Sequence, residues 1–156
     1  RPAAELDAAR QLRVAYQDVP VHEEPVILPQ VRGRVLDCEL RVRLDRARRF
    51  GMRFACGNGH WTELRLDLED GVLRIDRRHA GGFRDGMELR ETPLIALDGV
   101  LELRMVLDRY SAEFFLQGGR QVASLALYDT PADADGIEFF ARGQASLDLR
   151  LWDLAL

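Results

Sequence analysis

Two carboxylates, Asp108 and Glu113, are the residues of this sequence whose types and spacing could form a catalytic pair. Glycosidases place two carboxyl groups beside the bond they cleave, one acting as acid and the other as base or nucleophile. Both residues lie near the junction of two expected strands, where hydrogen bonding to backbone or arginine is the structural explanation. We expect Asp108 and Glu113 to stabilise the fold, and an enzyme that uses them stays an alternative.

Aromatic residues beside turns are the candidates for sugar contact. Trp61 and His60 directly follow the turn Gly57–Gly59, and Tyr110 stands at the start of a later hairpin. An exposed ring offers a flat apolar face, but aromatic residues also dominate protein cores. We therefore expect the aromatic residues to pack in the core, and Trp61, His60 and Tyr110 are the candidates for sugar contact as the alternative.

Other chemistry has little support in the sequence. His22, His60 and His79 are far apart and lack the spacing of a zinc site. Cys38 and Cys56 fall on expected strand faces, where a buried small side chain is the simplest interpretation. Two cysteines are also too few for a secreted disulfide framework, which favours a cytoplasmic location. We expect no metal and no cofactor.

The composition fits one folded domain without a nucleic-acid or membrane partner. The 156 residues are 47% apolar, and the longest apolar run falls far short of the roughly 20 residues that a membrane span needs. All 22 basic residues are arginine, and 26 acidic residues give a net charge of −4. Arginine alternates with acid along the same segments, which is typical of charges paired across neighbouring strands.

The apolar residues repeat with a period of two over most of the chain. Cys38, Leu40, Val42 and Leu44 alternate with charged residues, and several similar runs follow, separated by turn residues. This pattern predicts about ten short strands and an all-β, two-sheet antiparallel β-sandwich of the concanavalin-like jelly-roll type.

Two hairpins have predictable registers. Asp70-Gly71 predicts a two-residue turn with Leu66 opposite Ile75 and Asp67 opposite Arg74.

A second turn at Gly118-Gly119 predicts Phe115 opposite Val122 and Glu113 opposite Ser124. Both registers place apolar side chains on one face of the sheet.

The N-terminal residues follow a different pattern. Pro2–Leu12 has the early proline and acids of a short helix, and three prolines then punctuate an extended stretch. We therefore divide the chain into a linker helix and connection at 1–30 and a β-sandwich domain at 31–156. The start at Arg1 suggests a piece of a longer polypeptide.

Residues 101–120 resemble the C-terminal signature of glycoside hydrolase family 32. The family shows a leucine–arginine strand, then Val-Asp-x-Ser-Ser-x-Glu-Val-Phe and an Asn-x-Gly turn. Tyr110 replaces the first serine and Gln117 replaces the asparagine. A second segment, 73–78, is similar to the family's Leu-x-Val-Asp-Arg stretch. The positions that carry the resemblance, expected to be structural, are Asp76, Arg77, Arg104, Asp108, Ser111, Glu113, Phe115 and Gly119.

The resemblance implies a β-sandwich that follows a five-bladed catalytic propeller. The family's Asn-Asp-Pro-Asn-Gly, Arg-Asp-Pro and Glu-Cys motifs are absent, since Arg84-Asp85 precedes glycine and Cys38-Glu39 has the reverse order. No catalytic residue is therefore expected in this chain.

The expected role is that of an accessory domain of a levanase, invertase or other β-fructofuranosidase. Its partner would be the propeller, docked beside an apolar patch near residues 1–30, with a fructo-oligosaccharide and a homo-oligomer as further possibilities. A free-standing carbohydrate-binding module is the alternative.

Overall fold

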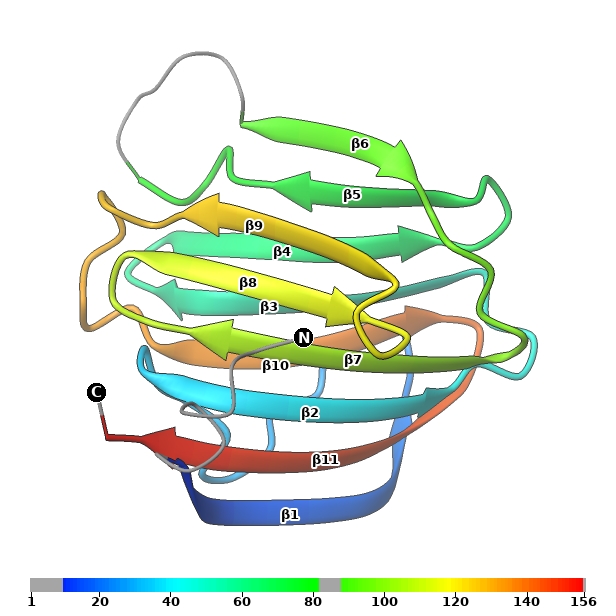
Figure 1. The fold of residues 1–156 in the computed structure, drawn as a ribbon, viewed down its shortest axis with the longest axis horizontal. Coiled ribbons are helices and arrows are strands. Elements are labelled where there is room, and N and C mark those ends of the chain that lie inside the picture. The colour runs from blue at the N-terminus through cyan, green and yellow to red at the C-terminus, as the bar shows by residue number, and fades with distance from the viewer. Residues whose placement is uncertain (1–9, 82–87, 156) are drawn as a thin grey trace.

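The computed structural model describes residues 10–81 and 88–155, which form two antiparallel sheets stacked face to face (Figure 1). The six-stranded sheet has the order β1 (Arg10–Val21), β11 (Ala145–Leu154), β2 (Leu36–Arg43), β7 (Val100–Leu107), β8 (Ser111–Leu116), β9 (Gln121–Ala126). The five-stranded sheet has the order β10 (Gly136–Arg142), β3 (Arg49–Gly57), β4 (His60–Asp67), β5 (Val72–Asp76), β6 (Leu89–Pro93). The predicted β-sandwich is confirmed, and no helix in these ranges is long and apolar enough to cross a membrane.

The core lies between the facing sheets, as the alternating pattern predicts. Leu101, Leu103 and Met105 of β7 are buried, while their charged neighbours point to the outer face. Phe54 of β3 meets Phe114 of β8 edge to face across the two layers, with ring centroids 5.4 Å apart. Burial of the inner side of strands such as β7 and β8 is what fixes their register.

The hairpin of β8 and β9 has the expected register. Phe115 lies opposite Val122 and Glu113 lies opposite Ser124. Gln117, Gly118 and Gly119 all have positive φ, between 52° and 90°. Glycine adopts this conformation without a Cβ clash, so the glycine pair permits the tight turn.

The hairpin of β4 and β5 differs from its prediction by two residues. Leu66 lies opposite Leu73 and Asp67 opposite Val72, so the connection is Leu68–Gly71 rather than Asp70-Gly71 alone. The Leu68 amide instead donates to the Arg48 carbonyl, 2.9 Å away. A shift of two leaves every side chain on its expected face, and the predicted ion pair of Asp67 with Arg74 still forms diagonally.

The N-terminal helix was expected at 2–12, and its described part is strand. Residues 10–12 begin β1, which pairs with β11 through Arg10–Leu154, Gln11–Asp153 and Leu12–Trp152. Residues 1–9 lie outside the described ranges. Because β1 adds an edge to the six-stranded sheet, the sandwich includes residues that the sequence pattern assigned to the connection at 1–30.

Candidate functional site

Asp108 closes the turn between β7 and β8, which we call the signature turn (residues 108–111). Its carboxylate accepts hydrogen bonds from the Tyr110 amide at 2.7 Å, the Ser111 amide at 2.8 Å and the Ser111 hydroxyl at 3.1 Å. The Asp108 amide in turn donates to the Ser111 carbonyl at 2.9 Å. The expected structural role of Asp108 and Ser111 therefore has a specific geometry, a side chain that organises its own turn.

Arg34 is hydrogen-bonded to the signature turn, and no sequence pattern indicated this residue. This buried guanidinium donates to the backbone carbonyls of Arg109 at 2.8 Å and Pro131 at 2.7 Å. Burial lowers the pKa of Arg34, and the charges of Asp135 and Asp108 oppose that shift. Arg34 thus links the signature turn to the loop that follows β9.

Arg104, another signature position, pairs with the fully buried Asp37 on the outer face of the six-stranded sheet. Arg104 Nε donates to Asp37 at 3.0 Å, and Arg10 of β1 donates to the same carboxylate at 3.1 Å. The Arg10 guanidinium also lies 3.9 Å from the centre of the Trp152 ring. Arg104 therefore helps to join β7, β2 and β1, and charge-assisted hydrogen bonds of this kind are strong.

Glu113 differs from its expected role in a polar network. Its side chain is exposed on the outer face of β8, opposite Val106 and Ser124, and it makes no hydrogen bond or ion pair with another described residue. The structure therefore separates the two candidate acids, since Asp108 accepts three hydrogen bonds and Glu113 accepts none. Phe115, two residues along, is half-buried on the same face.

Asp76 ends β5, and Arg77 directly follows it. Asp76 accepts two hydrogen bonds from the Arg78 guanidinium, at 3.0 and 2.7 Å, and these hold the pKa of Asp76 below its usual range. Arg77 reaches the other sheet and donates to the Ala126 carbonyl of β9 at 2.9 Å. Arg77 is thus one of the side chains that close the open side of the sandwich.

Trp61 and His60 lie on β4, apart from Tyr110. The Trp61 ring is half-buried and stacks on the His79 imidazole, with ring centroids 3.9 Å apart and planes 18° from parallel. His60 packs beside Gly81, whose φ is 94° and which has no room for a larger side chain. Because His79 covers a face of the Trp61 ring, the structure gives this pair little support as a sugar platform.

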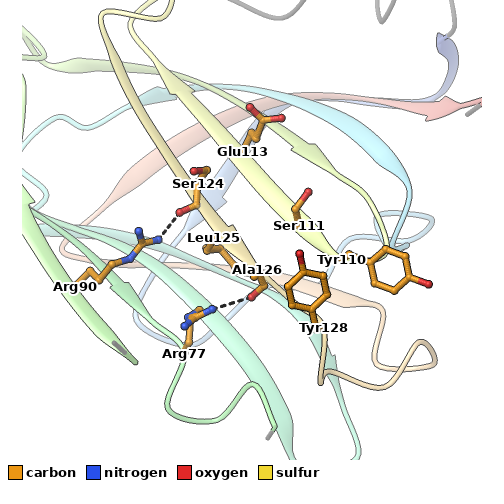
Figure 2. A pocket seen from close by; sticks show the side chains of 9 residues that line it. All are labelled: Arg77, Arg90, Tyr110, Ser111, Glu113, Ser124, Leu125, Ala126 and Tyr128. Carbon is orange, nitrogen blue, oxygen red and sulfur yellow. Dashed lines mark hydrogen bonds between the residues drawn. The ribbon is translucent and has the colours of Figure 1, made fainter. Parts of the chain in front are cut away.

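Tyr110 instead lines a groove of about 460 Å³, the tyrosine groove (Figure 2). Tyr110 and Tyr128 are 58% and 69% exposed, and their ring centroids are 6.0 Å apart. Besides these two rings, the groove is lined by Arg77, Arg90, Glu113 and Ser124. Of these lining residues, Tyr110 alone was named as a candidate for sugar contact; Arg77, Arg90 and Ser124 come from segments that only the fold brings beside it.

Residues 10–81 and 88–155 contain no evident centre for metal binding or thiol chemistry. No group of three or more histidine, cysteine, aspartate or glutamate side chains there could hold a metal ion. Cys38 and Cys56 are both free thiols. Burial raises the pKa of the Cys56 thiol to about 12. A thiol with so high a pKa is a poor nucleophile at neutral pH.

The described residues form an antiparallel β-sandwich domain, and the tyrosine groove is an aromatic-lined recess on its surface. The family described as "Glycosyl hydrolases family 32 C terminal" matches residues 5–153. The chain belongs to this family, as the sequence signature indicated.

Relatives of known name share the sequence over part of their length. A probable sucrose-6-phosphate hydrolase of Vibrio cholerae is 38% identical over 93 residues, and the levanase of Bacillus subtilis (strain 168) is 29% identical over 113 residues. These matches cover 59% and 68% of this chain. The chain spans 16% of the length of each of these two relatives.

Solved structures show the same fold. The exo-inulinase of Aspergillus awamori superposes with a TM-score of 0.81 at 17% identity, covering 96% of this chain and 31% of that chain. The sucrose-6-phosphate hydrolase of Lactobacillus gasseri gives 0.77 at 19% identity, covering 98% and 30%. The galectin LEC-6 of Caenorhabditis elegans gives 0.66 at 12% identity, covering 89% of this chain and 95% of that chain.

Proposed function

We propose that this chain is the non-catalytic C-terminal accessory domain of a glycosidase that hydrolyses β-fructosides, and that it stabilises the catalytic propeller. The observation that carries the proposal is the structural role of the signature residues Asp108 and Arg104. Asp108 accepts three hydrogen bonds within its own turn, and Arg104 is bound to the buried Asp37. These groups maintain the fold, and the family's nucleophile and acid motifs are absent from the sequence.

The names of the relatives support a β-fructoside as the substrate of the whole enzyme. The relatives named above are a levanase and a probable sucrose-6-phosphate hydrolase, and a fructan beta-fructosidase of Streptococcus mutans matches 98% of this chain at 22% identity. Each of them is far longer than the matched region, which supports a second, larger part of the enzyme that carries the chemistry.

Two exposed apolar side chains support docking of that part beside the first strand. Leu12 on β1 and Ile27 in the following connection are 54% and 70% exposed. Exposed apolar surface that belongs to a contiguous patch marks a site of partner docking, and both residues lie within the segment 1–30 where the propeller was expected to attach. The propeller is the occupant that we propose for this surface.

The test compares the parent enzyme with and without residues 1–156. We expect removal to lower the melting temperature of the propeller, and separately added chain to restore it. The Leu12→Asp and Ile27→Asp variants should restore it less well, whereas Val122→Asp, an exposed apolar position on β9, serves as the matched control. An unchanged melting temperature after removal would contradict the accessory role, and sugar release by the isolated chain would contradict the non-catalytic one.

The tyrosine groove favours a second candidate, a carbohydrate-binding module that acts without the propeller. Its two exposed rings and mixed polar lining are a recess of the kind in which small ligands bind. Binding of sugar by the chain with no effect on the propeller would favour this second candidate.

A further inference from the structure

The tyrosine groove lies where the open edges of the two sheets meet. β9 ends the six-stranded sheet and β6 ends the five-stranded sheet. Arg90 of β6 donates to the Ser124 carbonyl of β9, and Arg77, after β5, donates to the Ala126 carbonyl (Figure 2). The two arginines therefore enter the groove from one sheet, and both tyrosines enter it from segments that flank the other.

The groove presents both hydrogen-bond donors and acceptors. A guanidinium carries five N–H groups, and among the described residues each of these two arginines donates to one backbone carbonyl. The Nε atom of Arg77 is itself buried, and no residue in 10–81 or 88–155 accepts a hydrogen bond from it. Glu113 on the same lining is a free acceptor, since it has no partner among the described residues.

The charges argue against an anion as the ligand. Neither Arg77 nor Arg90 has a carboxylate partner among the described residues. Burial, and to a lesser extent the nearby positive charge of Arg77, lowers the pKa of Arg90. Two such cations could attract a phosphate, but Glu113 would repel it and would be left without a donor. A ligand that both donates and accepts hydrogen bonds satisfies all three side chains.

The strand edge argues against a bound peptide. A peptide that adds a strand to a sheet needs free backbone groups along the edge. On β9 the carbonyls of Ser124 and Ala126 already accept hydrogen bonds from arginine. The Gln121 side chain accepts from the Ile95 amide and donates to the Pro93 carbonyl. The edge is therefore occupied by side chains of the same molecule.

The backbone that carries the two tyrosines is hydrogen-bonded within the chain itself. The Tyr110 amide donates to Asp108 at 2.7 Å, and the Tyr110 carbonyl accepts from the Leu127 amide, also at 2.7 Å, next to Tyr128. Preorganised groups lose little freedom on binding. The volume of about 460 Å³ lies within the range of small-ligand sites.

We infer that the tyrosine groove binds a neutral carbohydrate, with a sugar ring on Tyr110 or Tyr128 and its hydroxyls on Arg77, Arg90 and Glu113. A sugar hydroxyl both donates and accepts hydrogen bonds, and the C–H face of a sugar ring suits an exposed aromatic face. The choice of a β-fructosyl oligosaccharide as the ligand rests on the proposed function, whereas the carbohydrate class rests on the groove alone.

The experiment titrates the 156-residue chain with 1-kestose, followed by saturation-transfer NMR and calorimetry. Maltotriose and inorganic phosphate are titrated in parallel. We expect saturable but weak binding of 1-kestose, with a Kd on the order of 1 mM. Maltotriose and phosphate should bind at least about fivefold more weakly.

Substitutions then locate the binding surface. Tyr110→Ala and Tyr128→Ala should each weaken binding at least about fivefold, and Glu113→Gln should weaken it less because an amide oxygen still accepts. Ile27→Ala removes an exposed apolar side chain outside the groove and should leave binding unchanged. All variants are first checked for an unaltered melting temperature.

Several results would overturn the inference. The inference is overturned if neither sugar binds saturably. It is also overturned if both tyrosine variants still bind 1-kestose, or if Trp61→Ala is the only variant that abolishes binding. Binding of phosphate without 1-kestose would show an anion site instead. Equal binding of maltotriose and 1-kestose would overturn the β-fructosyl assignment, and none of these results depends on whether the chain stabilises a propeller.

Discussion

The two acids of the family signature should respond differently to removal, because only one of them is hydrogen-bonded. Asp108→Ala deletes an acceptor of three hydrogen bonds in the signature turn. A hydrogen bond to a charged group contributes about 1.5–3 kcal/mol, but Asp108 is half-exposed and water will replace part of the loss. Loss of a comparable capping side chain costs about 0.5–2 kcal/mol, so we expect a decrease of about 2 kcal/mol in the free energy of unfolding.

Differential scanning calorimetry at neutral pH measures this effect. For a domain of this size, 1 kcal/mol corresponds to about 2–4 °C, so Asp108→Ala should lower the melting temperature by about 4–8 °C. Asp108→Asn keeps one oxygen acceptor and should lose less. The matched control is Glu113→Ala, an exposed change expected to stay within about 0.5 kcal/mol. A similar decrease for both acids would refute the reasoning, as would no decrease for Asp108→Ala.

Three further changes test the packing and the charges. Asp37→Ala leaves two arginines beside a buried gap and should reduce the free energy of unfolding in urea by about 3–5 kcal/mol; a loss below about 1 kcal/mol would contradict this. Gly51→Ala places a Cβ 2.2 Å from the Phe140 ring and should cost about 1–3 kcal/mol, with Phe140→Ala relieving part of that cost in the double variant; additive losses would argue against the clash. Hydrogen bonds from Arg43 lower the pKa of Asp148 to about 2. Since the unfolded value is about 3.9, this stability is present above about pH 4 and is lost as the pH falls towards 2. Asp148→Asn should therefore flatten the decrease in melting temperature between pH 4 and 2, and an unchanged slope would exclude this contribution.

The strands were predictable because burial on one side of a sheet imposes a period of two on the sequence. The run from Leu101 to Leu107 shows this directly, since its odd positions are buried in the core. The β8–β9 hairpin was also predictable, because a glycine pair fixes the turn length and the turn length fixes the register. In both cases the information is local, within about ten residues.

The β4–β5 turn shows where local information fails. Asp70-Gly71 favours a two-residue turn, but backbone groups of the connection bond to other parts of the chain, Leu68 to Arg48 and Gly71 to Leu94. Those partners lie outside the hairpin, so no pattern within residues 63–78 indicates them. The strand at Arg10–Leu12 has the same cause, because pairing with β11 overrides a helix-like composition.

Buried charges were missed for a related reason. Asp37 and Arg34 look like ordinary strand and turn residues in the sequence, yet Asp37 is fully buried and Arg34 spans two loops. Their partners, Arg104 and the carbonyls of Arg109 and Pro131, are about 70–100 residues away. A charge can be buried only where such partners converge, and convergence is a property of the folded chain.

The tyrosine groove follows the same logic and explains why Tyr110 was noticed and its neighbours were not. Tyr110 adjoins the family signature, whereas Tyr128 and Arg90 belong to segments with no motif. The groove exists because two sheet edges meet, and the arginines that protect the β9 edge also line it. A device that blocks edge-to-edge pairing thus also places two guanidinium groups in the lining of a recess with exposed aromatic rings. Binding capacity at this position would therefore arise from the way the sandwich closes its open side.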